Sequence, residues 1–214
     1  MSKTTQIEPK SIILKAKDPI VLECGDTLQN VRIAYTTWGT LNDTRTNVVW
    51  VFHALTANGN PQEWWPEMVG YDQVINPEEH FIICANMLGS CYGTTGPTNM
   101  NFPLVTINDM VKAHKILKNH LELDKIFLGI GGSMGGQQLL EWAVQEPELF
   151  ENIVPLATNA FHSPWGIAFN EAQRMALENI DSAKGLEAAR AIAMLSYRHY
   201  DTYNSTQKDV DQRW

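Results

Sequence analysis

Two continuous apolar runs, residues 48–53 and 81–85, dominate the hydrophobic pattern of the first half of the chain. Neither run alternates with polar residues, and strands without alternation are typical of a parallel sheet that is covered on both faces. Two shorter β-branched segments, residues 20–24 and 31–38, are separated by a Gly-Asp-Thr turn. The turn predicts that these two segments pair as antiparallel edge strands.

Strands and helices alternate in the middle of the chain. Residues 107–121 carry apolar side chains at helical spacing. Strands are expected at 125–130 and 152–157, and the segment between them predicts a helix that ends near Gln145. This alternation indicates an α/β fold with a mostly parallel sheet and right-handed crossovers.

The pattern changes after Ser163, where residues 166–180 and 183–200 predict two successive helices with no strand between them. We interpret these helices as a cap that is inserted on the sheet, because no low-complexity linker separates them from it. The expected division is therefore an α/β core over residues 1–162 and the start of a helical cap region over residues 163–214.

The sequence Gly-Gly-Ser-Met-Gly-Gly at residues 131–136 follows one of the expected strands and precedes a helix. Gly131 and Gly135 bracket Ser133 in the G-x-S-x-G pattern of a nucleophile elbow, a sharp turn that exposes the serine oxygen. The turn also directs the amide of Met134 and the positive end of the helix at a developing oxyanion. Glycine-rich turns of this kind also bind phosphates. The setting favours Ser133 as the nucleophile of an acyl-transfer reaction.

An oxyanion hole needs a second amide from the loop after an earlier strand. The residues His53-Ala54-Leu55-Thr56 occupy that place, and we expect the amide of Leu55 to be the second donor. His53 is predicted to hold this loop by hydrogen bonds rather than to take part in catalysis.

A serine nucleophile also needs a base, and in this fold an acidic residue and then a histidine follow the serine. The histidines after Ser133 are His162 and His199, and neither follows a late sheet strand. Both remain candidates, since triads are recognised by geometry. We expect the C-terminal part of the fold to be missing from the chain, and the sheet to expose an apolar edge there.

The composition of the chain excludes some classes of binding partner. The net charge of −8 and the pI near 5.2 argue against nucleic acid or an anionic membrane. No stretch has the character of a signal peptide or a membrane span, which predicts a cytoplasmic protein. Cys24, Cys84 and Cys91 lack the spacing of a disulfide framework or a metal site and are expected to be reduced. Cys91 lies in a glycine-rich loop and is predicted to be a buried structural thiol.

Four motifs together resemble those of homoserine O-acetyltransferases of the α/β-hydrolase superfamily. They are residues 53–56, the pair Trp64-Trp65, residues 86–97 (Asn-Met-Leu-Gly-Ser-Cys-Tyr-Gly-Thr-Thr-Gly-Pro) and residues 131–136, in the order of the family. The resemblance continues through residues 168–174, 185–190 and 196–198. Ala57 stands where many members have glycine. The resemblance implies an α/β-hydrolase fold with an inserted helical cap.

It also implies that acetyl-CoA, as a cosubstrate, acetylates Ser133, and that L-homoserine then receives the acetyl group in methionine biosynthesis. No bound cofactor or metal is expected, and the partners would be these small molecules and a second subunit in a homodimer. The family's acidic residue and histidine lie on segments after the cap, beyond Trp214. The chain would then be a truncated and inactive form.

Two arginines are candidates for the homoserine carboxylate, because a planar guanidinium matches two carboxylate oxygens. Arg198 lies in a Ser-Tyr-Arg sequence that resembles the family's substrate-binding arginine. Arg174 is the second candidate, and its alternative role is an ion pair with Glu171 or Glu178 on its own helix. Three alternatives stay open: homoserine O-succinyltransferase, serine O-acetyltransferase, and a serine ester hydrolase or inactive fragment.

Overall fold

The computed structural model describes residues 8–99, 101–179 and 182–206. The chain forms two compact units, Met1–Ala160 and Phe161–Trp214. The boundary expected from the sequence, after residue 162, lies close to this division.

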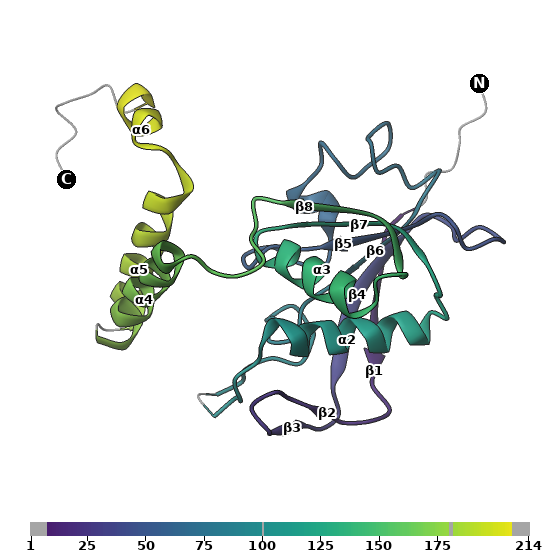
Figure 1. Ribbon diagram of the computed structural model, residues 1–214, viewed down its shortest axis with the longest axis horizontal. Coiled ribbons are helices and arrows are strands. Elements are labelled where there is room, and N and C mark those ends of the chain that lie inside the picture. Colours follow the sequence, from purple (N-terminus) through teal and green to yellow (C-terminus); the bar gives the residue numbers. More distant parts are fainter. Residues whose placement is uncertain (1–7, 100, 180–181, 207–214) are drawn as a thin grey trace. The chain divides into compact units, whose positions relative to one another are not determined.

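The first unit contains a six-stranded sheet with the strand order β1-β4-β6-β5-β7-β8 (Figure 1). Neighbouring strands among β6, β5, β7 and β8 run parallel, while β4 runs antiparallel to both β1 and β6. The predicted α/β class with a mostly parallel sheet is confirmed. The strand bounds are β1 Lys10–Lys15, β4 Arg32–Trp38, β5 Val48–Phe52, β6 Phe81–Ala85, β7 Ile126–Gly132 and β8 Phe150–Leu156.

The predicted pairing of residues 20–24 with 31–38 is wrong. β4 pairs instead with β1, in a register that sets Ile13 opposite Ala34. Ile20–Val21 (β2) pairs with Thr27–Leu28 (β3) in a separate two-stranded sheet. Gly25 has φ +94° in the turn between them, so the turn closes a short local hairpin and leaves β4 free to pair elsewhere.

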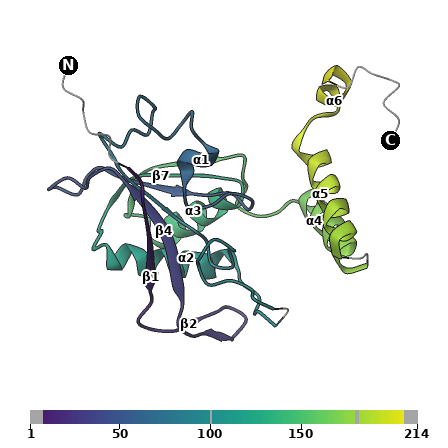
Figure 2. The ribbon, with the colours of Figure 1, turned by 180° about the vertical axis from the view of Figure 1, so that it is seen from behind.

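Side chains of β5 alternate between two apolar cores, one on each face of the sheet. Trp50 and Phe52 lie in the core that α2 (Ile107–His120) and α3 (Met134–Gln145) cover. Val49 and Val51 lie in the other core, against which Trp64 and Trp65 pack. Figure 1 shows α2 and α3 on one face, and Figure 2 shows the short helix α1 (Pro61–Trp64) on the other. Burial on both faces, predicted from the unbroken apolar run, is therefore confirmed.

The helix α2 begins with a reciprocal cap. The Thr106 hydroxyl accepts from the Asp109 amide, and the Asp109 carboxylate accepts from the Thr106 amide, which satisfies two amides of the first turn. Lys118 of α2 pairs with Glu146, which follows the end of α3, with 2.8 Å between Nζ and Oε2. This pair joins the two helices beneath the sheet.

The strand β8 begins two residues before the predicted start, and within the described residues its only strand partner is β7. The apolar side chains of Ile153, Val154 and Leu156 are exposed. The expected apolar edge is present in the structure.

The second unit contains α4 (Pro164–Asn179), α5 (Ser182–Tyr197) and α6 (Tyr200–Thr206). The helices α4 and α5 pack against each other, and the buried residues of α5 are the small Gly185, Ala189 and Ala193. The helix predicted over residues 183–200 ends earlier, at Tyr197, and α6 is a separate helix that begins at Tyr200. Among the described helices, none combines the length and the apolar character that crossing a membrane requires.

Candidate active site

Ser133 lies between β7 and α3 in a backbone conformation that side chains rarely adopt. Its φ is 54° and its ψ is −123°, and its side chain is exposed. The end of β8 and the loop after it hold this turn. The Ser133 amide donates to the carbonyl of Leu156 at 3.0 Å, and the Thr158 hydroxyl donates to the carbonyl of Ser133 at 2.7 Å. The predicted turn between strand and helix is thus confirmed, with a strained serine at its tip.

Three glycines around Ser133 lie where a side chain would collide with backbone. A Cβ at Gly131 would lie 2.7 Å from the carbonyl of Gly135, and a Cβ at Gly135 would lie 2.2 Å from the carbonyl oxygen of Phe52. A Cβ at Gly136 would lie 2.6 Å from the Thr158 side chain and 2.9 Å from the carbonyl oxygen of Gly131. The G-x-S-x-G spacing is therefore a requirement of close packing between α3 and the strands, as the sequence indicated.

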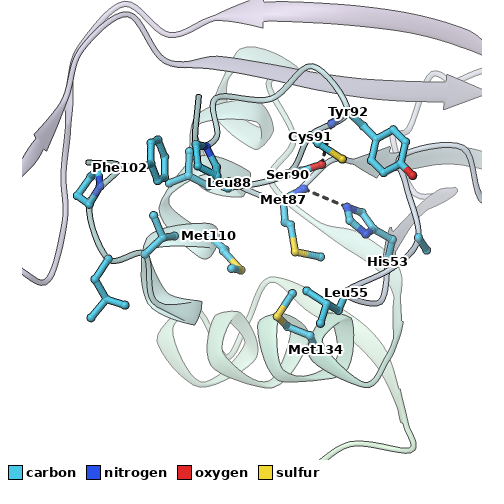
Figure 3. Close-up of a pocket in the computed structure, with 16 residues that line it drawn as sticks. His53, Leu55, Met87, Leu88, Ser90, Cys91, Tyr92, Phe102, Met110 and Met134 are labelled. Atoms are coloured by element: carbon cyan, nitrogen blue, oxygen red, sulfur yellow. Dashed lines mark hydrogen bonds between the residues drawn. The ribbon is translucent and has the colours of Figure 1, made fainter. Parts of the chain in front are cut away.

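The two predicted oxyanion donors lie beside one cavity. Leu55 follows β5, Met134 is the first residue of α3, and both line this cavity (Figure 3). The first amides of a helix have no acceptor within the helix. In the part of the chain that the structure describes, the Leu55 amide also has no hydrogen-bond acceptor. The structure brings the residues together, and their role as donors stays a prediction.

His53 links the loop after β5 to the loop after β6. The ring is buried, with Nδ1 2.8 Å from the carbonyl oxygen of Ala54 and Nε2 3.1 Å from the amide nitrogen of Met87 (Figure 3). Because an amide can only donate, Nε2 accepts and Nδ1 carries the proton. Burial lowers the pKa of His53, so the ring stays neutral at pH 7. The predicted role of His53 in holding this loop is confirmed.

The loop of residues 86–97 is fixed by buried side chains. The Asn86 side-chain oxygen accepts from the amide of Gly59 at 2.7 Å. The Thr94 hydroxyl donates to the Asn86 carbonyl at 2.8 Å and accepts from the amide of Ala34 at 2.9 Å. Residues 86–97, one of the four motifs that resemble the family, therefore form a fixed part of the cavity wall.

The cavity has a volume of about 530 Å³ and a mainly apolar wall. Among the described residues that line it, none is Lys, Arg, Asp or Glu, and the one histidine is the neutral His53. The stretch 102–105 was not recognised from the sequence, where its apolar residues before the Thr106 cap are the only signal. The lining residues are His53, Leu55, Ala57, Met87, Leu88, Gly89, Ser90, Cys91, Tyr92, Pro97, Phe102, Pro103, Leu104, Val105, Met110 and Met134.

The prediction that Cys91 is a buried structural thiol is wrong. Cys91 is exposed and lines the cavity, between Gly89 and Gly93, whose φ angles are both +92°. These two left-handed glycines turn the chain sharply, so the segment between them lies at the surface. Cys84 is the buried cysteine, and burial raises the pKa of its thiol. Within the described residues, no group of three or more His, Cys, Asp or Glu side chains is arranged to hold a metal ion.

The remaining predicted site residues belong to the second unit. Arg174 makes two hydrogen bonds to Glu171 Oε2, one of them from Nε at 2.9 Å, so the ion pair considered from the sequence is present. Arg198 is exposed after the end of α5. His162 is exposed, and His199 Nδ1 lies 3.3 Å from a carboxylate oxygen of Asp201. Their roles toward Ser133 stay predictions.

Three comparisons with known proteins agree on the fold. A profile of the α/β hydrolase fold family matches residues 47–193. The homoserine O-acetyltransferase of Cyclobacterium marinum is 44% identical over 97% of this chain. The crystal structure of homoserine O-acetyltransferase from Staphylococcus aureus matches 95% of this chain and 62% of its own, with a TM-score of 0.80 and 27% identity. The structure of esterase E22 matches 97% of this chain and 70% of its own, with a TM-score of 0.79 and 21% identity, a likeness of fold alone.

The chain spans 64% of the length of the Cyclobacterium marinum relative and the same share of the homoserine O-acetyltransferase of Chlorobaculum tepidum. The latter is 40% identical over 93% of this chain.

Proposed function

The chain belongs to the α/β-hydrolase fold family, and on this basis we propose that it carries the nucleophile of a homoserine O-acetyltransferase. The observation that carries the proposal is the strained, exposed Ser133 on a turn where Gly131 and Gly135 leave no room for a side chain, and whose next residue, Met134, lines one cavity with Leu55. The relatives of this name match nearly the whole chain at about 40% identity.

The chemistry has two steps. In the first, a base takes the Ser133 proton while the Ser133 oxygen attacks the thioester carbonyl of acetyl-CoA. The carbon–sulfur bond then breaks, and CoA leaves with that proton. In the second, the hydroxyl of L-homoserine attacks the serine ester, and Ser133 regains its proton through the same base. The amides of Leu55 and Met134 stabilise the negative oxygen of both tetrahedral intermediates. A base for Ser133 is a required component, and His162 and His199 are the candidates within the described residues.

An acetyl donor fits the cavity better than a succinyl donor. A succinyl group ends in a carboxylate, and burying an unpaired carboxylate is costly. The cavity wall offers no lysine or arginine to pair with it, whereas an acetyl group needs only apolar contacts. Homoserine and serine differ by one methylene, which a pocket distinguishes by only about 1–3 kcal/mol. The proposal that homoserine is the acceptor is therefore supported by the names of the relatives and not by the cavity.

We further propose a homodimer in the cytoplasm. Exposed apolar side chains of the helical unit, including Trp165, Leu186 and Leu195, are consistent with a subunit interface. The exposed thiols Cys24 and Cys91 fit a reducing compartment, as does a CoA thioester substrate.

The test is to incubate the protein with acetyl-CoA, or with succinyl-CoA as the matched donor, and to measure intact mass and released CoA with and without L-homoserine. With the chain extended to the length of the curated relatives, we expect an acetyl adduct on Ser133 that homoserine removes, and no succinyl adduct. Release of acetate from the adduct at the same rate without homoserine would favour an ester hydrolase. A chain that forms no adduct with either thioester, while Ser133 still reacts with a fluorophosphonate, would contradict the proposed donor.

A further inference from the structure

A buried polar pair, His114 and Gln138, lies behind the nucleophile turn and is not part of the cavity wall. His114 comes from α2 and Gln138 from the second turn of α3, and both are almost completely buried. His114 Nε2 lies 3.0 Å from the side-chain oxygen of Gln138, and Gln138 Nε2 donates to the carbonyl of Met134 at 3.3 Å. A chain of two hydrogen bonds therefore runs from α2 to the residue that supplies an oxyanion donor.

The direction of these bonds follows from the groups present. The Gln138 amide nitrogen donates to Met134, so its oxygen faces His114 and accepts from Nε2. His114 is then neutral and protonated on Nε2. Its Nδ1 is buried and has no partner within the described residues. Buried polar atoms without a partner are uncommon, so the orientation of this ring needs an explanation in the packing around it.

Aromatic rings surround His114 and fix that orientation. The imidazole stacks on Trp142, with ring centres 5.8 Å apart and planes at 18°, and it meets Trp50 and Phe52 edge to face. Phe52 is the last residue of β5, and its backbone approaches Gly135 closely. His114 therefore contacts the strand that leads to Leu55, and through Gln138 it contacts the helix turn that begins at Met134.

We propose that His114 and Gln138 are positioning residues that set the first turn of α3 against the end of β5, and so hold the two oxyanion donors in register. The inference rests on the proposed acyl transfer at Ser133 and adds the residues that align its electrophilic site. Neither residue touches the substrate, and their effect is transmitted through Met134 and Phe52. Oxyanion stabilisation depends steeply on where the donors lie. A small shift of this turn therefore lowers the rate at which Ser133 attacks a carbonyl or phosphonyl group.

The test measures phosphonylation of Ser133 by a fluorophosphonate, a reaction that needs the oxyanion donors and neither acetyl-CoA nor homoserine. Gln138→Leu keeps the side-chain volume but removes both hydrogen bonds. Gln137→Leu is the control, because Gln137 is the next residue on α3 and its side chain bonds outward to Asn159. We expect Gln138→Leu to lower the maximal labelling rate about tenfold or more with little change in the half-saturating concentration, and Gln137→Leu to match the native chain.

Two further measurements separate positioning from general stability. Gln138→Glu keeps the acceptor for His114, and its ionised carboxylate has no donor for the Met134 carbonyl, so we expect its labelling to slow as the pH rises through the pKa of that carboxyl although the bond to His114 is retained. Nitrogen NMR of the native chain should show His114 protonated on Nε2 alone. A Gln138→Leu variant that stays folded by circular dichroism and labels within twofold of the native rate overturns the inference, as does a His114 ring protonated on Nδ1.

These results are independent of the donor and acceptor. Slow labelling of Gln138→Leu in a chain that ignores acetyl-CoA would contradict the proposed function and support the inference. Labelling of Gln138→Leu at the native rate, in a chain that transfers acetyl groups, would support the proposed function and contradict the inference. A native chain that is never labelled would contradict the role of Ser133 and, with it, the inference.

Discussion

A β-carbon on Gly135 would lie 2.2 Å from the carbonyl oxygen of Phe52, which places the first turn of α3 directly against the end of β5. No side chain fits at that distance without moving one backbone segment away from the other. The two predicted donors, Leu55 and Met134, come from distant parts of the chain and lie beside one cavity, and this backbone contact brings their segments together.

Gly135→Ala should therefore damage both folding and the site. Overpacking of this kind costs about 1–3 kcal/mol or more, because backbone rather than a flexible side chain must move. Gly132→Ala is the matched control, since a Cβ at Gly132 has its nearest neighbour 3.9 Å away. Urea unfolding of both variants checks this. Equal stability of the two would show that α3 can shift freely.

Ser133→Ala should abolish acetyl-enzyme formation and leave the free energy of unfolding within about 0.5 kcal/mol of the native value, because the side chain is exposed. The hydrogen bonds of this residue to Leu156 and Thr158 use its backbone and are retained. Ser133→Gly should be more stable than Ser133→Ala by about 1 kcal/mol, since glycine accepts φ of 54° without strain. Intact mass and thermal unfolding give both answers. An acetyl adduct of the same yield on the alanine variant would refute the assignment.

His53→Ala should destabilise the protein and impair Ser133 chemistry together. The substitution leaves the amide of Met87 without its acceptor, at a cost of about 1–3 kcal/mol, and frees the loop that carries Leu55. His120→Ala, at an exposed position of α2, is the control. Urea unfolding and fluorophosphonate labelling are the measurements. A labelling rate unaffected by His53→Ala would separate this loop from the oxyanion site.

Arg198→Lys should weaken homoserine use and leave acetylation of Ser133 near normal, because lysine keeps the charge and loses the two-pronged geometry. Arg174→Lys is the comparison, since Arg174 already has Glu171 as its partner. Separate measurement of the two half-reactions decides the case. Equal loss in both half-reactions for Arg198→Lys would indicate support of the helices instead of substrate binding.

Acidification should unfold the protein in part through His114. Burial lowers the pKa of His114 to about 4, below its ordinary value of 6.5. Between these values the unfolded chain binds a proton that the folded chain does not, so stability falls as the pH drops from about 6.5 to about 4. The full effect of this one group is about 3 kcal/mol. Burial also lowers the pKa of His53, which adds to the effect in the same direction.

Urea unfolding at a series of pH values should therefore show a smaller loss of stability for His114→Gln than for the native chain. The glutamine cannot titrate, and its amide can still donate to Gln138. Identical pH dependence of the two proteins would show that folding does not lower the pKa of His114.

The local elements followed from the sequence wherever neighbouring residues decide them. The apolar run ending at Phe52 is long enough and uniform enough to define a buried strand, and the spacing of glycines around Ser133 defines the turn because the collisions are local to the fold of that segment. The helix that contains His114 is likewise predicted by the spacing of its apolar residues.

Only the tertiary structure decided which distant segments meet. The pairing of β4 with Lys10–Lys15, the exposure of Cys91 in the cavity wall, and the bond from His53 to Met87 depend on contacts between residues far apart in the chain. The hydrophobic pattern says that a residue is buried and does not say against what. For the same reason the helical spacing over residues 107–121 does not say what His114 contacts, and the packing of two helices on one sheet makes it the partner of Gln138.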